Sequence, residues 1–310
     1  MKKYTSILIM ALAAMCITGC RTSKNAGNSI QSEVWQTMLV KQLDAQIDDQ
    51  IITVKYNNGS TLCYKILDNF GNVSLTWDRT NGRKSFDDGE SSYKGDISIP
   101  SFIVSGANDE FVFRVMEIDE NAFYGCTGVT SIDIPFSIQR IVNDAFKDCT
   151  SLVKFKVNDN NQSYKDIDGI LFSKDGSMLI TYPSQKKGEE YVIGESVSII
   201  CTEAFKNNQY LKNLTIGNSV LTISDYAFKN CSSLQTVEIG NSVRIIGKQS
   251  FFDCPKLELI NVHGLFPPHN CPIVFEKATK ESCKLYVPRG QVMNYKRRLE
   301  WDEFKNIQEY

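Results

Sequence analysis

The sequence predicts a mostly β fold with short helical turns, a solenoid built from 23-residue repeats. Three observations lead to this prediction. An Ala-Phe pair recurs every 23 residues, an apolar residue follows each Phe at the sixth position, and two further apolar residues then alternate with polar ones. Alternation with a period of two indicates a short strand that buries one face. A repeat of this length cannot bury its apolar face alone, so successive repeats are expected to stack.

The Ala-Phe pairs set the register of five repeats. The third residue after each Phe is Cys in four repeats and Asn208 in the remaining one. The spacing between pairs is 23 residues except for one spacing of 59, which is a repeat enlarged by an insert of 36. The pairs are Ala122-Phe123, Ala145-Phe146, Ala204-Phe205, Ala227-Phe228 and the variant Ser250-Phe251.

The insert, about residues 158–190, is predicted to contain a β-hairpin. Its apolar residues alternate on both sides of the sequence Lys174-Asp175-Gly176-Ser177. Asp followed by Gly between two alternating runs is typical of hairpin turns.

The repeat resembles the BspA-like leucine-rich repeats of bacterial surface proteins. The segment from Ile118 to Cys126, followed by Ile132-Asp133-Ile134-Pro135, is close to the family pattern. The resemblance implies a leucine-rich-repeat array over residues 119–262. A solenoid needs closed ends, so it also implies a β-rich N-terminal cap over residues 51–118 and a C-terminal cap over residues 263–310 that ends in a helix.

Residues 1–19 have the pattern of a bacterial lipoprotein signal peptide. Lys2 and Lys3 precede an apolar run of 11 residues, which is too short to span a bilayer. The run ends in Ile17-Thr18-Gly19-Cys20, which resembles a lipobox. Cys20 is therefore the expected lipidation site, with an ordinary secretory signal as the alternative, and we expect a lipid anchor in the outer membrane.

Residues 20–50 are predicted to form a tether, with a short helix over residues 33–49 as one option. Val34, Met38 and Leu39 would lie on one side of that helix. Residues 21–25 contain no acid, whereas acids follow the lipidated cysteine in surface-exposed lipoproteins of some Gram-negative phyla. The cell surface and the periplasmic face of the membrane both stay open.

The cysteines indicate structure rather than chemistry. Cys126, Cys149, Cys231 and Cys254 share one repeat position, and such residues are expected to be buried thiols, because side chains that run parallel suit bridge geometry poorly. Cys271 and Cys283, in the closing segment, are better candidates for a disulfide.

The sequence contains no motif for catalysis or metal binding. It lacks Gly-x-Ser-x-Gly, His-Glu-x-x-His and a glycine-rich phosphate loop, and only two histidines are present. No Cys-x-x-Cys pair points to zinc. The formal net charge of −2 does not suggest a nucleic-acid surface. We therefore expect no catalytic residues, no metal, no cofactor and no enzyme activity.

The alternation also identifies the side chains expected on the outward face of the sheet. This stripe is polar, mixed in sign and free of aromatic residues, which favours a protein partner over a glycan. A solvated face without a ligand is the alternative. The outward residues are Ser131, Asp133, Lys154, Lys156, Asn213, Thr215, Thr236, Glu238, Leu259 and Asn261.

Taken together, the sequence predicts a non-enzymatic, lipid-anchored binding or adhesion protein of the bacterial envelope. Its partner is expected to be a protein of the host matrix or of a bacterial surface. A periplasm-facing structural or accessory lipoprotein is the alternative, and a glycan-binding subunit or an enzyme is the least favoured.

Overall fold

The computed structural model describes residues 42–48, 51–56, 60–80, 85, 88, 91–105, 111–270 and 273–310. The predicted signal peptide, Cys20, the tether as far as residue 41 and Cys271 lie outside these residues. The chain divides into two compact units. The first comprises Met1–Cys149 and Val157–Ser163, and the second comprises Thr150–Lys156 and Tyr164–Tyr310.

The first unit contains a largely antiparallel sheet with the strand order β1-β2-β3-β4-β7-β6, in which β9 also pairs with β7. Strands β4 and β7 run parallel, as do β7 and β9. A separate parallel pair joins β5 and β8. The strands are β1 Gln42–Asp48, β2 Ile51–Tyr56, β3 Thr61–Ile66, β4 Asn72–Thr76, β5 Lys94–Ser98, β6 Phe102–Ser105, β7 Phe111–Ile118, β8 Gly128–Ile134 and β9 Arg140–Ile141.

The expectation of a helix over residues 33–49 is wrong for residues 42–48, which form strand β1. Gln42–Asp48 pair antiparallel with β2, so that Ala45 faces Val54 and Asp48 faces Ile51. Leu43, Ala45 and Ile47 alternate with polar residues, which is the period of a strand. The pairing partner supplied by β2 therefore decides the conformation of this stretch, since tertiary context overrides weak helical spacing.

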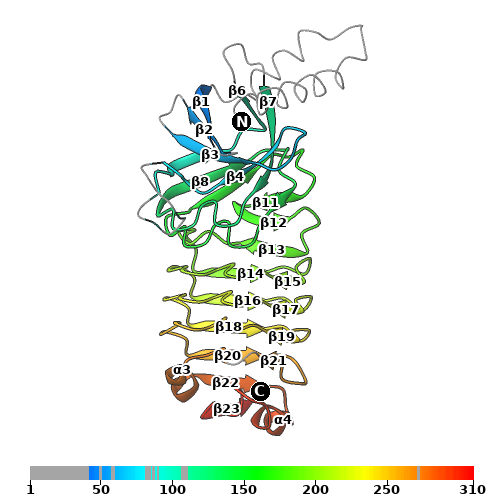
Figure 1. The fold of residues 1–310 in the computed structure, drawn as a ribbon. Coiled ribbons are helices and arrows are strands. Elements are labelled where there is room, and N and C mark those ends of the chain that lie inside the picture. Colours follow the sequence, from blue (N-terminus) through cyan, green and yellow to red (C-terminus); the bar gives the residue numbers. More distant parts are fainter. Residues whose placement is uncertain are drawn as a thin grey trace. The chain divides into compact units, whose positions relative to one another are not determined.

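The second unit is a stack of parallel strands that confirms the predicted solenoid (Figure 1). One sheet has the order β14-β16-β18-β20-β22-β23, and we call it the six-stranded sheet. Its central strands pair residues 23 apart, as Asn213 with Thr236. Its strands are β14 Glu190–Ile193, β16 Asn213–Ile216, β18 Thr236–Ile239, β20 Leu259–Val262, β22 Lys284–Val287 and β23 Asn306–Glu309.

A second sheet of this unit has the order β11-β12-β13-β15-β17-β19-β21. Strands β11, β12 and β13 pair antiparallel and form the insert, with the turn at residues 174–177 between β12 and β13 as predicted. From β13 onward the strands are parallel. The strands are β11 Tyr164–Ile167, β12 Ile170–Ser173, β13 Met178–Thr181, β15 Ile199–Ile200, β17 Thr222–Ile223, β19 Ile245–Ile246 and β21 His269–Asn270.

The repeated phenylalanines form a stack inside the second unit. Phe228 is fully buried, with ring centroids 4.7 Å from Phe205 and 5.0 Å from Phe251. The stack continues to Tyr182 at one end and to Phe275 at the other. Aromatic pairs at these distances add to the stabilisation from buried area, so each repeat is held to the next through one ring.

The cysteine of each repeat is buried, as the sequence predicts. The thiol of Cys231 donates to the carbonyl oxygen of Phe205 at 3.2 Å, and that of Cys254 donates to Phe228 at 3.2 Å. Each bond joins a repeat to the preceding one, so the thiol satisfies a buried carbonyl. Burial raises the pKa of Cys254 to about 12. Cys283, half of the candidate disulfide, is a free and fully buried thiol.

The C-terminal cap contains two short helices, α3 Lys277–Ser282 and α4 Val292–Lys296. Helix α4 lies where helical spacing was expected, but the chain continues past it to β23, so the cap ends in a strand. Strand β23 pairs with β22 because the final residues extend the six-stranded sheet. Trp301 and Tyr295 are fully buried in the cap. No helix among the described residues is long and apolar enough to cross a membrane.

Candidate binding face

The outward face of the six-stranded sheet is built by simple alternation. Leu214 and Ile216 of β16 point into the core, as do Val237 and Ile239 of β18. The residues between them therefore face outward, and the parallel register aligns them in two columns. One column is Glu190, Asn213, Thr236, Leu259 and Lys284, and the other is Val192, Thr215, Glu238, Asn261 and Tyr286.

Hydrogen bonds link polar neighbours within each column. Thr236 Oγ1 donates to Asn213 Oδ1 at 2.7 Å, and Asn213 Nδ2 donates to Glu190 Oε1 at 3.2 Å. Asn261 Nδ2 donates to Glu238 Oε1 in the second column. These bonds limit the rotamers of the outward side chains, so the face presents a preorganised surface.

The structure brings together six of the predicted face residues. Thr215 is exposed, and the other five are half-buried. The six are Asn213, Thr215, Thr236, Glu238, Leu259 and Asn261.

Lys154 and Lys156 do not belong to this sheet. They lie on β10 Lys154–Val157, where both are exposed. The insert explains the difference, because the N–H of Phe155 donates to the carbonyl of Gly169 at the turn between β11 and β12. Strand β14, after the insert, takes the place beside β16. Both lysines therefore face outward, as the alternation predicts, but on a strand outside the six-stranded sheet.

Ser131 and Asp133 lie on β8 in the first unit, and only Asp133 has substantial exposure. Ser131 is 4% exposed, so the expectation that it is exposed is wrong. Strands β5 and β8 shift register between Gly95 and Asp96, and Ser131 is paired directly with Asp96. A short side chain beside this irregular pairing is covered by its surroundings.

Five side chains meet at the C-terminal end of the six-stranded sheet, and we call them the C-terminal cluster. They are Glu238, Asn261, His263, Tyr286 and Tyr310. His263 Nε2 lies 2.7 Å from Glu238 Oε2, and His263 Nδ1 lies 3.0 Å from the Tyr310 hydroxyl. Tyr286 lies beside Asn261 in register. The cluster combines a carboxylate, an imidazole, an amide and two phenol rings on an open face.

Tyr310 remains accessible although it takes part in these contacts. Its side chain is 56% exposed. Partial burial and the charge of Glu238 raise the pKa of Tyr310 above its ordinary value. The Tyr310 hydroxyl can donate or accept a hydrogen bond with a partner.

The two tyrosines correct the expectation that this face lacks aromatic residues. That expectation considered only the strands of the five repeats, whereas β22 and β23 extend the same sheet. The run Lys284-Leu285-Tyr286-Val287 alternates as the repeat strands do, with Leu285 and Val287 buried. The same alternation could have placed Tyr286 outward from sequence alone. Nothing in the spacing of Tyr310 marks it as part of the face.

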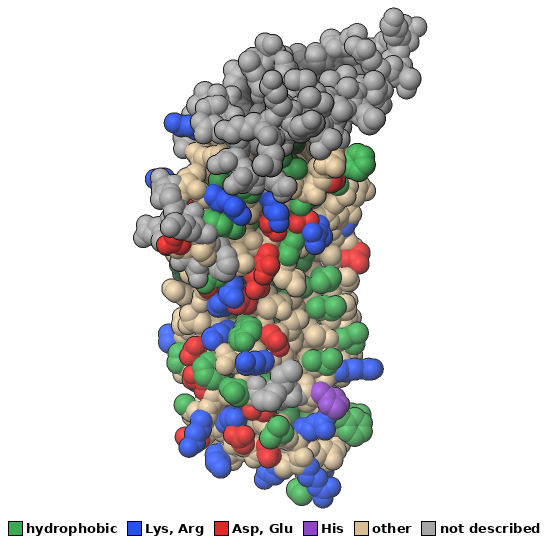
Figure 2. Space-filling view, in the orientation of Figure 1, with side chains coloured by type: hydrophobic (Ala, Val, Ile, Leu, Met, Phe, Trp, Pro, Cys, Tyr) green, Lys and Arg blue, Asp and Glu red, His purple; other side chains and the backbone are tan. Residues whose placement is uncertain are grey.

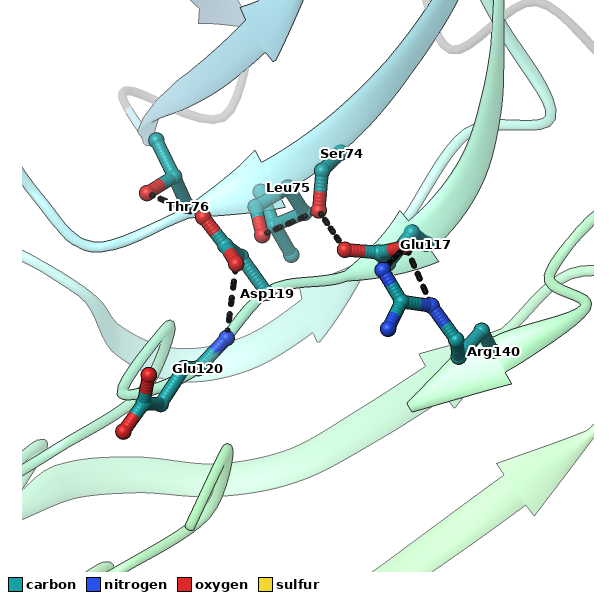
Figure 3. A network of polar contacts seen from close by, with 7 residues as sticks. All are labelled: Ser74, Leu75, Thr76, Glu117, Asp119, Glu120 and Arg140. Carbon is teal, nitrogen blue, oxygen red and sulfur yellow. Dashed lines mark hydrogen bonds and ion pairs between the residues drawn. The ribbon is translucent and has the colours of Figure 1, made fainter. Parts of the chain in front are cut away.

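A second polar network lies in the first unit (Figure 3). Glu117 of β7 is 6% exposed and accepts a hydrogen bond from Arg140 Nε of β9 at 2.7 Å. Ser74 Oγ of β4 lies 3.4 Å from the same carboxylate. A buried carboxylate needs such partners, and these partners come from the two strands β4 and β9, which both pair with β7. The network thus has a structural role in joining β4, β7 and β9.

Among the described residues, no group of three or more His, Cys, Asp or Glu side chains is placed to hold a metal ion. The contacts of the C-terminal cluster are hydrogen bonds between side chains, which suit recognition of a partner.

Comparisons with known proteins agree with this architecture. The model of the BspA type leucine rich repeat region matches six copies over residues 116–187 and 181–268. A leucine-rich repeat protein from Eubacterium ventriosum has a similar solved structure, with a TM-score of 0.56 and 19% identity over 80% of this chain and 79% of that one. A leucine rich cell surface protein from Faecalibacterium prausnitzii gives a TM-score of 0.46 and 17% identity, over 87% and 96% of the two chains. No curated protein matches the chain.

Proposed function

This chain belongs to the BspA-like leucine-rich-repeat family, and from that premise we propose that it is a lipid-anchored envelope protein that binds another protein through the outward face of its six-stranded sheet. Repeat solenoids present extended faces of this kind to partners. The partner would be a component of the host matrix or of a bacterial surface.

The C-terminal cluster is the single observation that favours this face as the contact surface. Tyrosine is enriched among the residues that dominate interface energetics, because it combines a large apolar ring with a polar tip. Tyr286 and Tyr310 stand beside the charged Glu238 on a preorganised sheet. The cluster would anchor the partner, and the polar columns would form the surrounding contacts.

Capture from an envelope or matrix extract, followed by cross-linking and mass spectrometry, tests this proposal. The variant Tyr286→Ala/Tyr310→Ala should lose about tenfold or more of the captured protein, since truncating an interface anchor costs 2 kcal/mol or more. The melting temperature should change little, because both side chains face outward.

Lys154→Gln/Lys156→Gln is the control, since these exposed side chains lie on β10, outside the six-stranded sheet. It should capture the partner as the unchanged protein does. Equal capture by the tyrosine variant and this control would reject the six-stranded sheet as the contact surface.

A glycan is the second candidate ligand, and the same two tyrosines favour it. Sugar rings stack on exposed aromatic rings, and carboxylate and amide groups bind their hydroxyls. A glycan array probed with the soluble chain tests this alternative. Saturable binding to one glycan class, lost in Tyr286→Ala/Tyr310→Ala, would favour a glycan over a protein.

The orientation of the protein in the envelope is a separate question. We propose the cell surface, with a periplasm-facing accessory role as the alternative. Protease treatment of intact cells should remove the protein if it faces outward, while a periplasmic marker protein stays intact. Protection equal to that of the marker would favour the periplasmic role.

A further inference from the structure

The loop between β20 and β21 packs against the segment around α4 in the C-terminal cap. The Tyr295 hydroxyl donates to the carbonyl of Gly264 at 2.9 Å, and Trp301 Nε1 donates to the carbonyl of Pro268 at 3.3 Å. Arg298 Nη2 lies 3.0 Å from His269 Nε2. Residues 264–269 and 295–301 therefore form one surface at the end of the second unit.

Large apolar side chains are exposed on this surface. Leu265 is 60% exposed and Phe266 is 74% exposed, and they are consecutive in the loop. Met293, just before the second segment, is 58% exposed, and Leu299, within it, is 62% exposed. Two adjacent apolar side chains are thus both largely open to solvent. We call Leu265, Phe266, Met293 and Leu299 the apolar tip.

Cations are frequent in the second of the two chain segments that carry these apolar residues. Residues 285–299 contain Arg289, Lys296, Arg297 and Arg298 with no Asp or Glu, and residues 259–275 contain no acid either, although the whole chain carries a formal charge of −2. The next acid, Glu300, is 5% exposed and binds Lys280 and the N–H groups of the 273–274 segment. Glu303 is exposed and pairs with Lys280, and Asp302 is exposed. Figure 2 shows hydrophobic, basic and histidine side chains together around α4 and β21.

We propose that this tip, formed by Leu265, Phe266, Met293 and Leu299 with Lys296, Arg297 and Arg298, docks on an anionic lipid surface. Exposed apolar side chains can enter the boundary between headgroups and acyl chains, and neighbouring cations bind lipid phosphates. A protein partner would be favoured by a flat patch near 1,000 Å², whereas four exposed apolar side chains, with the exposed Lys296 and Arg297 between two of them in the chain, fit a lipid interface. This site lies outside the binding face described above and is independent of that proposal.

Flotation with lipid vesicles tests the proposal. The chain from residue 20 onward is used with Cys20→Ser, so that no attached lipid contributes. It should float with vesicles of phosphatidylglycerol and phosphatidylcholine, and far less with phosphatidylcholine alone. Leu265→Ser/Phe266→Ser should weaken binding about tenfold or more. Lys296→Gln/Arg297→Gln should weaken it about fivefold for each cation and remove much of its salt dependence.

Two matched controls separate the tip from general surface properties. Leu67→Ser/Phe70→Ser removes an exposed Leu and Phe from the first unit, where they are 42% and 70% exposed. Lys154→Gln/Lys156→Gln removes two exposed cations from β10. Both controls should bind vesicles as the unchanged chain does, and circular dichroism melting should confirm that all variants fold.

Three results would overturn the proposal. The first is no flotation with anionic vesicles, and the second is equal flotation of the Leu265→Ser/Phe266→Ser variant. The third is self-association in sedimentation velocity that this variant abolishes while vesicle binding persists, because the tip would then contact a second copy of the chain.

Discussion

Two backbone positions in each repeat have a positive φ, mostly on residues other than glycine. They are the second residue before and the second residue after the repeat phenylalanine, as Tyr226 at 59° and Asn230 at 58° around Phe228. A Cβ atom is strained in this region by roughly 1–2 kcal/mol. Gly125 occupies the second position in the first repeat at 63°. The turns keep this geometry because it directs the ring inward and lets the N–H of Asn230 bond to the carbonyl of Phe252 at 2.9 Å.

This strain gives a prediction for Asn230. Both Asn230→Gly and Asn230→Val remove the exposed side-chain bond to Asn207, so the comparison isolates the backbone conformation. The Val variant should be less stable than the Gly variant by about 1–2 kcal/mol, because a β-branched residue resists positive φ. Urea denaturation measures the difference. Equal stability would mean that the turn relaxes when a side chain is placed there.

The exposure of some single residues follows from the sequence, and that of others does not. The spacing predicts that Glu238 faces outward, and it does, because β18 is a regular strand between two regular neighbours. The same reasoning does not predict the burial of Ser131, which is 4% exposed, because alternation gives no information on what covers a side chain. The contact of His263 with Tyr310 joins residues 47 apart, so it depends on how the final strand returns to the sheet.

At the scale of elements, the aromatic stack predicts graded stability effects. Phe228 is fully buried between two stacked rings, whereas Phe146 is half-buried and stacks on Phe123 at 5.7 Å. Phe228→Ala should therefore cost about 3–5 kcal/mol, and Phe146→Ala should cost less. Lys156→Ala is the exposed control and should cost under about 0.5 kcal/mol. Denaturant midpoints that fall in the opposite order would contradict the assignment of the two faces.

The elements that sequence predicts best are those with a repeated period. Strands β16, β18 and β20 follow from alternation because both neighbours of each strand have the same pattern. Strand β1 and strand β23 differ from expectation because each takes its conformation from a pairing partner, β2 or β22. The place of β10 depends on the insert, whose turn carbonyl at Gly169 accepts a bond from Phe155. Local spacing contains none of these pairings.

For the whole molecule, the 23-residue period sets both the core and the candidate binding face of the second unit. Inward residues at the period fill the stack, and outward residues align in columns. The caps add the groups that distinguish this chain from a uniform array. They contribute Tyr286 and Tyr310 to one surface and the apolar tip of Leu265 and Phe266 to another. The features with the most chemistry therefore lie where the repeat ends, which is also where sequence periodicity gives the least information.

The last prediction concerns attachment of the whole chain to the membrane. Cys20→Ala should abolish both lipid attachment and signal-peptidase processing. The mature chain would otherwise carry several acyl chains, each worth about 0.8 kcal/mol per buried methylene, which is far more than a few exposed side chains at the tip can supply. Labelling with a fatty acid and detergent partitioning measure the effect, and the variant should lose the label and leave the detergent phase. Cys201→Ala, at a half-buried repeat position, is the matched control and should keep both the lipid label and its place in the detergent phase.

High salt distinguishes the lipid anchor from the apolar tip. Anchoring by acyl chains should resist high salt, whereas residual membrane binding through Arg297 and Lys296 should not. An unlabelled wild-type protein that partitions as the variant does would show that Cys20 carries no anchor.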